Sequence, residues 1–221
     1  MKISQRTTWT VNDGTEDFPA RFEPANDNDF LTHVKENRAV VGYLTPDPEP
    51  GGYYWTENDC GEYLNFNRRT IHSRDFIEFD ELQDLVRKSP GRVFWIACYE
   101  HSAVRFYRSG NAIGEHPTRP STAPALETLH IPDQQWDVST AIAIYVAPDD
   151  TPDPAAYCDG QMEAWSDWCN GSIYGVVVMT LERETEDDDW NEVDSDECWG
   201  YIGYTHALAS LKETFEYHRD Q

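Results

Sequence analysis

Ten carboxylates stand within sixteen residues near the end of this 221-residue chain, between Glu182 and Glu197. Arg183 is the only counter-charge in that run. Closely spaced carboxylates can pair with Arg and Lys side chains, imitate a row of phosphates or coordinate Ca²⁺. An aromatic residue ringed by such charges can anchor a partner. We therefore expect a partner-binding site at these residues: Glu184, Glu186, Asp187, Asp188, Asp189, Trp190, Glu192 and Asp194.

The carboxylate run has two other interpretations. Charge runs are most often solvated faces, and this one fits an exposed hairpin loop. A calcium site could use Asp187, Asp189 and Asn191, but the glycine and the terminal Glu of an EF-hand loop are absent at the required spacing. We therefore expect no metal here.

A second group with potential chemistry is Cys98 with His101. Their spacing resembles a metal or nucleophile pair, and Asp137 beside Trp136 could orient the imidazole in a cysteine-protease-like triad. The five cysteines form no CxxC pair, so neither a four-thiolate zinc site nor a disulfide framework is indicated. We expect free thiols packed as small hydrophobic side chains, no catalytic residue and no cofactor. A small Cys- or metal-dependent hydrolase remains an alternative.

The whole chain is strongly acidic, with 41 Asp and Glu against 17 Lys and Arg and a net charge of -24. This charge argues against direct binding of nucleic acid or of an anionic membrane, because both require Lys and Arg. Twenty-four charges match those on ~40 Å of duplex DNA, and a compact chain of this length has a diameter near ~45 Å. One face could therefore imitate a short duplex. A high-salt cytoplasm would also select acidic surfaces, which keeps solvation alone as an alternative.

Secondary-structure patterns place the acidic run between two strands. The last third is predicted to form a helix over Ala155–Trp168, strands over Ile173–Leu181 and Glu197–Tyr204, and a helix over Ala207–Tyr217. Upstream we expect helices over 29–37 and Phe76–Lys88, strands over Ala39–Leu44, Glu62–Asn67 and Thr140–Val146, a hairpin of Arg92–Cys98 with Val104–Arg108, and a long loop over 109–135.

Hairpin-connected strands predict an α+β fold with mainly antiparallel sheets and flanking helices. We divide the chain into an N-terminal α+β region, 1–90, and a C-terminal α+β region, 91–221, with one continuous domain as the alternative. The start of the chain has no apolar signal segment, and no apolar run reaches the ~20 residues of a membrane span. A cytoplasmic protein is expected.

Two motifs in the last third resemble a family of uncharacterised proteins from phages and other mobile elements. They are Cys169-Asn-Gly-Ser-Ile-Tyr-Gly-Val-Val177 and Asp196-Glu-Cys-Trp-Gly-Tyr-Ile-Gly203. The segments Tyr99–Ser102 and Gln135–Ser139 are also similar to that family, so the resemblance covers about residues 92–210. It implies a mobile-element origin and no particular reaction.

Together these observations predict a non-enzymatic inhibitor of a host DNA-handling defence protein, of the anti-restriction or anti-CRISPR type. Its carboxylates would occupy a basic DNA channel in place of DNA, and a homodimer is left open. The alternatives are a generic soluble mobile-element or halophile domain that is acidic for solvation only, and the hydrolase above.

Overall fold

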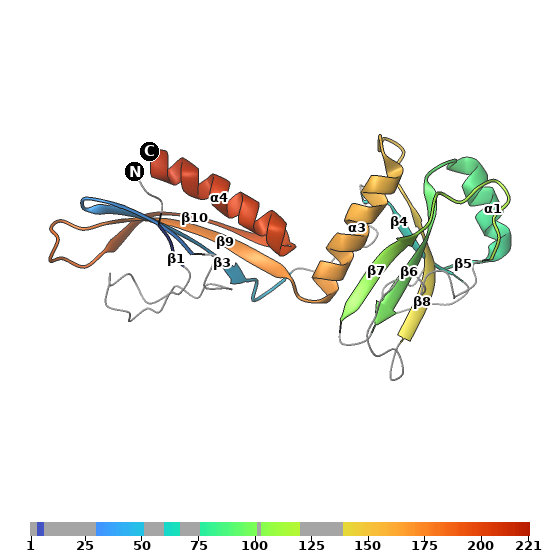
Figure 1. The fold of residues 1–221 in the computed structure, drawn as a ribbon, viewed down its shortest axis with the longest axis horizontal. Helices are drawn as coiled ribbons and strands as arrows, with labels where there is room; N and C mark the ends of the chain where they lie inside the picture. The colour runs from blue at the N-terminus through green and yellow to red at the C-terminus, as the bar shows by residue number, and fades with distance from the viewer. Residues whose placement is uncertain (1–3, 7–29, 51–59, 67–75, 101–102, 120–138) are drawn as a thin grey trace. The chain divides into compact units, whose positions relative to one another are not determined.

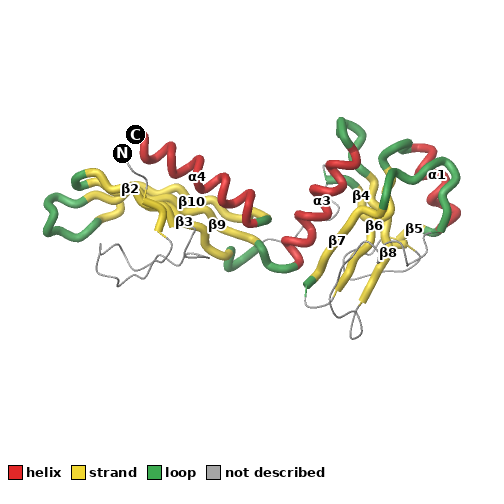
Figure 2. Tube along the Cα trace, viewed as in Figure 1, coloured by secondary structure: helices red, strands yellow, loops and turns green. Residues whose placement is uncertain are grey.

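Two five-stranded sheets form the framework of the chain, and they are antiparallel except for one short parallel pair (Figure 1). This computed structural model describes residues 4–6, 30–50, 60–66, 76–100, 103–119 and 139–221. Helices pack on the sheets, as Figure 2 shows by colour. The predicted α+β class with mainly antiparallel sheets is therefore confirmed.

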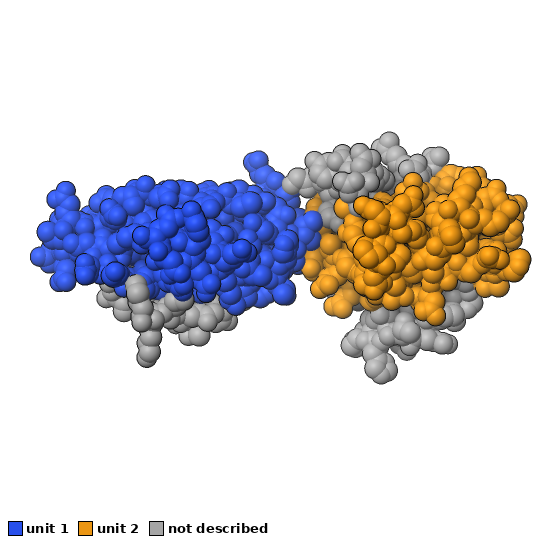
Figure 3. Space-filling view, turned by 90° about the horizontal axis from the view of Figure 1, so that it is seen from above, with its two compact units in different colours: residues 1–51, 171–221 blue, residues 52–170 orange. Residues whose placement is uncertain are grey.

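The chain divides into two compact units, coloured separately in Figure 3. Unit 1 combines residues 1–51 with 171–221, and unit 2 consists of residues 52–170. Unit 2 is thus inserted between two strands of the unit 1 sheet. The predicted division at residue 90 differs from this one, since that residue lies inside unit 2. Pairing between strands far apart in the sequence sets the division, and local patterns do not report such pairing.

The sheet of unit 1 has the strand order β1-β2-β3-β9-β10. Helix α4 lies along one face of it (Figures 1 and 2). The elements are β1 (Ser4–Arg6), β2 (Phe30–Lys35), β3 (Arg38–Pro46), β9 (Ile173–Glu182), β10 (Asn191–Ile202) and α4 (Tyr204–Asp220).

Alternate residues of the central strands β3 and β9 are buried on opposite faces of this sheet, as period-2 geometry requires. On the α4 face, Val40, Val176 and Val178 pack with Leu211 and Phe215. The opposite face carries a second apolar cluster, formed by Phe30, Ala39, Val41, Tyr43, Val177, Met179, Leu181 and Trp190.

Unit 2 contains a sheet of order β5-β4-β8-β6-β7, with helix α3 on one face and α1 on the other (Figure 1). Its elements are β4 (Glu62–Phe66), β5 (Phe76–Ile77), α1 (Phe79–Lys88), β6 (Val93–Glu100), β7 (Val104–Ser109), β8 (Ser139–Val146) and α3 (Pro154–Cys169). Trp165 of α3 fills one core, while Leu82 and Val86 of α1 fill the other.

Several predicted elements agree closely with the structure, among them α3, β9 and the β6–β7 hairpin. The helix expected over 29–37 is wrong, because β2 and β3 form an antiparallel hairpin there with Lys35 paired to Arg38. Glu36 takes a φ of 55° in the turn. This left-handed conformation is uncommon for Glu, so the residue type does not predict the turn. Of the long loop expected over 109–135, residues 120–135 lie outside the described residues.

Candidate functional site

The acidic run, Glu182–Glu197, forms the end of the β9–β10 hairpin, and we call it the acidic hairpin. Every one of its ten carboxylate residues is exposed. The second strand, expected from Glu197, begins at Asn191, so the run is only partly a loop. Five of the carboxylates belong to the turn and four to β10, with Glu182 at the end of β9.

Strand β10 forms the edge of the sheet and, among the described strands, pairs with β9 alone. Asp194 and Asp196 are paired with Thr180 and Val178, which places both carboxylates on the face that carries α4. Glu197 is paired with Val177 and therefore points to the opposite face. The edge consequently presents negative charge on both of its faces.

The turn of the acidic hairpin is held by specific hydrogen bonds. The backbone N–H and hydroxyl of Thr185 both donate to Asp188 Oδ2, at 2.9 and 2.7 Å. Asn37 Nδ2 donates to the carbonyl oxygen of Glu184 at 2.9 Å, which ties this turn to the β2–β3 turn. Asp188 therefore shapes the loop although it is as exposed as its neighbours Asp187 and Asp189.

Trp190 does not occupy the position expected of a partner anchor. Its side chain is only 6% exposed and belongs to the apolar cluster with Phe30 and Tyr43. The Arg183 guanidinium lies over the indole, 4.3 Å from the ring centroid. The expectation of an exposed Trp190 is therefore wrong, because the indole contributes more by covering the sheet than by standing in water.

A buried histidine that the sequence analysis did not select contacts the acidic hairpin. His218, in the last turn of α4, lies with Nδ1 3.8 Å from Asp194 Oδ2 and Nε2 3.8 Å from Asp196 Oδ2. Only the sheet register and the position of α4 bring these residues together. One candidate carboxylate, Asp194, and its neighbour on the same strand face, Asp196, thus already face a titratable group of the same chain.

The acidic residues of unit 2 are distributed differently. There Arg108 forms a two-pronged pair with Asp159, at 2.7 and 2.8 Å, and Arg87 pairs with Asp84 along α1. Residues 171–221, in contrast, hold thirteen acidic and three basic residues. The strongest local excess of negative charge in the described chain therefore lies on the C-terminal part of unit 1.

Of the residues named for the hydrolase alternative, only Cys98 lies in the described part of the chain. Cys98 is 3% exposed inside the core under α3, so its thiol does not face solvent. His101, Trp136 and Asp137 lie outside the described residues. None of the five cysteines forms a disulfide, and burial raises the pKa of Cys158 to about 12, which leaves this thiol protonated. Within the described ranges, no three His, Cys, Asp or Glu side chains form a metal-binding group.

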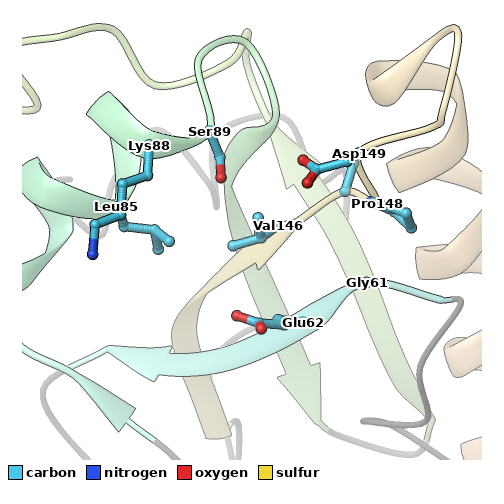
Figure 4. Close-up of a pocket in the computed structure, with 9 residues that line it drawn as sticks. Gly61, Glu62, Leu85, Lys88, Ser89, Val146, Pro148 and Asp149 are labelled. Atoms are coloured by element: carbon cyan, nitrogen blue, oxygen red, sulfur yellow. The ribbon is translucent and has the colours of Figure 1, made fainter.

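A hollow of ≈ 360 Å³ lies on unit 2 beside the C-terminal end of α1. Figure 4 shows Lys88 and Ser89 on one side of it, Asp149 on the other and Val146 between them. Arg92 lies next to the hollow but donates to the carbonyl oxygens of Pro148 and Asp149. The charged groups that line the hollow have mixed signs, and its lining contains no paired nucleophile and base.

Comparisons with protein-family models, with curated proteins and with solved structures gave no match. Among the residues described here, no helix is both long and apolar enough to cross a bilayer.

The two motifs that suggested a family have clear structural roles. Asn170 caps the end of α3 and exchanges two hydrogen bonds with the backbone of Val104, at 2.7 and 2.9 Å. Trp199, on a bulged part of β10, lies over Gly175 of β9 so closely that a Cβ on Gly175 would stand 2.4 Å from the indole. Gly175 and Trp199 thus shape the strands that carry the acidic hairpin, while Asn170 fastens α3 to β7.

We expect Gly175→Ala to destabilise unit 1 by about 1–3 kcal/mol, because the added methyl group overlaps the Trp199 ring. In a Trp199→Ala background the same substitution should cost less than about 0.5 kcal/mol, since the obstruction is gone. Urea unfolding of the four proteins measures the coupling. Equal costs in both backgrounds would show that the contact between the two residues is unimportant.

Proposed function

We propose that this chain is a non-enzymatic acidic protein that binds the basic DNA-binding surface of a host nuclease or defence complex in place of DNA. The proposal places it in the cytoplasm of a bacterial or archaeal cell and derives it from a phage or another mobile element. One observation carries the proposal: the acidic hairpin exposes all ten of its carboxylates along a turn and a sheet edge.

The charge spacing of β10 supports mimicry of a phosphate backbone. Four carboxylates stand between Glu192 and Glu197, a span of ~17 Å at the rise of a β-strand. A single strand of B-DNA carries one charge per ~3.4 Å of axis, or about five charges over that length. The edge strand therefore has a charge density close to that of one DNA strand, and the turn extends the row.

The position of the charges also favours a separate partner over a second copy. Two β10 edges paired with each other would set carboxylates opposite carboxylates, which destabilises a sheet. A partner surface rich in Arg and Lys would gain charge-assisted hydrogen bonds and fast, salt-sensitive association. The site residues in this proposal are the exposed carboxylates, and Trp190 is excluded because it is buried.

Solvation is the second candidate function of the acidic hairpin, and β10 itself is the observation that favours it. Charged side chains on an edge strand prevent it from pairing with the edge of another sheet. Natural proteins commonly need this protection. A purely protective role predicts that neutralised variants aggregate more readily without losing any specific partner.

The carboxylates of the turn provide the test. We expect Glu186→Gln, Asp187→Asn and Asp189→Asn together to weaken inhibition of the target nuclease about 10- to 100-fold, at about 0.5–1 kcal/mol for each ion pair. Inhibition by the wild-type protein should also fall steeply as the salt concentration rises, and inhibition by the variant should fall less steeply. Asp188 is left intact because it accepts the hydrogen bonds of Thr185. The measurement is cleavage of duplex DNA by purified restriction and CRISPR-type nucleases at low and high salt.

A matched control changes the net charge equally but in unit 2. Glu115→Gln, Asp150→Asn and Glu163→Gln remove three exposed carboxylates that lie outside the acidic hairpin. This control should inhibit nearly as well as the wild-type protein. If both triple variants inhibit equally, the acidic hairpin is only a solvated surface.

A further inference from the structure

His218 occupies an unusual position for a histidine near the end of a chain. It is 6% exposed, and the two carboxylates of Asp194 and Asp196 face its two different ring nitrogens at 3.8 Å each. Asp194 and Asp196 are separated by one residue of β10, so both point to the face on which α4 lies. The imidazole therefore bridges successive acidic positions of the edge strand.

The chemistry of imidazole makes this arrangement selective for one protonation state. A neutral ring has one N–H donor and one nitrogen lone pair, so one of the two carboxylates would face a lone pair. The imidazolium donates from both nitrogens and carries the charge that two carboxylates attract. Both contacts are therefore ion pairs only when the ring is protonated.

We propose that His218 is a protonation-dependent latch that fastens the C-terminal end of α4 to the edge strand β10. When the ring is protonated, both carboxylates hold it and the helix is fixed at this end. When the ring is neutral, one contact loses its attraction and the end of α4 loosens. The rest of the helix stays on the sheet because Ala207, Leu211 and Phe215 are buried there.

Other charged groups surround the latch. Arg38 of β3 donates from Nη2 to the His218 carbonyl oxygen at 3.0 Å, a contact that does not involve the imidazole ring. The side chain of Arg219 pairs with Asp220 at the exposed end of the helix. Among the described residues, the titratable and charged groups at this end of α4 are His33, Arg38, Asp194, Asp196, Glu216, Tyr217, Arg219 and Asp220.

His33 acts in the opposite direction and must be separated from the latch. Burial lowers its pKa, and the Arg219 and Arg38 charges lower it further. A histidine with a lowered pKa contributes stability above its ordinary value of about 6.5, and this stability is lost as the pH falls. The latch acts the other way, because only the imidazolium has an N–H to offer to each of the two carboxylates. Comparing variants at the same pH cancels the contribution of His33.

The latch has a consequence for partner binding that rests on the proposed function. Asp194 and Asp196 belong to the candidate partner surface, and a protonated His218 competes with the Arg and Lys of a partner for them. The affinity for a basic partner should therefore be higher when His218 is neutral than when it is protonated.

The decisive experiment measures stability without any partner. We expect His218→Gln to lower the melting temperature of unit 1 by at least about 3 °C more at pH 5.5 than at pH 8.0, relative to the wild-type protein at the same pH. Hydrogen exchange in the α4 segment should show the same pattern, with the loss of protection concentrated in its last two turns. In a protein that already carries Asp194→Asn and Asp196→Asn, the effect of His218→Gln should no longer depend on pH.

His206→Gln is the matched control, since His206 is an exposed histidine at the other end of α4. It should show no comparable pH-dependent difference. A His218→Gln effect that is equal at both pH values, or larger at pH 8.0, would overturn the latch. If His218→Gln does not fold, the double Asn variant decides, because the latch requires its destabilisation to be larger in acid. A latch confirmed here together with absent nuclease inhibition would refute only the proposed function.

Discussion

Replacing Trp190 by alanine is expected to destabilise unit 1 by about 3–5 kcal/mol, the cost of removing a large buried aromatic side chain. The indole packs against Phe30, Tyr43 and Met179 on the sheet face opposite α4. Arg183 would also lose its contact with the ring. The measurement is the free energy of unfolding in urea, followed by far-ultraviolet circular dichroism.

Trp199→Ala is the comparison for this experiment. Trp199 is 45% exposed on the edge strand, so its loss should cost only about 1 kcal/mol. The pair separates burial from proximity to the acidic hairpin, because both tryptophans lie in or beside it. If Trp190→Ala unfolds at the wild-type urea concentration but loses partner binding, the indole is an anchor and not a core residue.

Trp165→Ala should destabilise unit 2 by a similar amount, about 3–5 kcal/mol. Trp165 is fully buried, and its ring meets those of Tyr63, Phe106 and Tyr145 at centroid distances of 5.2, 5.8 and 5.7 Å in edge-to-face geometry. Such aromatic pairs add about 0.5–1.5 kcal/mol each beyond the burial of their area. Alanine at this position would leave a cavity that three other rings line.

This substitution also tests the division into units. Each described core cluster lies wholly within one unit, so unit 1 should keep its own unfolding transition when unit 2 is weakened. Calorimetry should show the unit 2 transition at a lower temperature and the unit 1 transition at an unchanged temperature. Trp168→Ala, on the same helix but only partly buried, should shift the unit 2 transition much less. A single transition that moves as a whole would show that the two units unfold cooperatively.

The sequence predicted those elements whose burial follows a local period. Helix α3 and strands β8 and β9 were expected close to their observed bounds, because apolar side chains recur at helical spacing in the first and fill the two strands. The β6–β7 hairpin and the order helix, strand, strand, helix at the end of the chain were also confirmed. The exposure of the acidic hairpin agrees with its composition, since unpaired carboxylates avoid burial.

The same reasoning failed where pairing and not periodicity decides the structure. Residues 30–35 have apolar positions that also fit a helix, yet they form β2 because β3 offers backbone partners beside it. Residues 191–200 show no apolar face, yet they form most of β10, because an edge strand needs only one neighbour and no buried side. Hydrophobic periodicity reveals a strand only where one face is buried, and residues 191–200 have no buried face.

The sequence by itself determined the charge of this protein, the location of its acidic hairpin and the antiparallel α+β class, because these follow from composition and local spacing. The tertiary structure alone decided that Trp190 is buried and that residues 52–170 are inserted between β3 and β9. It also decided that His218 meets Asp194 and Asp196. Each of these depends on contacts between residues that are not neighbours in the local pattern, and those contacts form only when the strands pair and α4 packs on them.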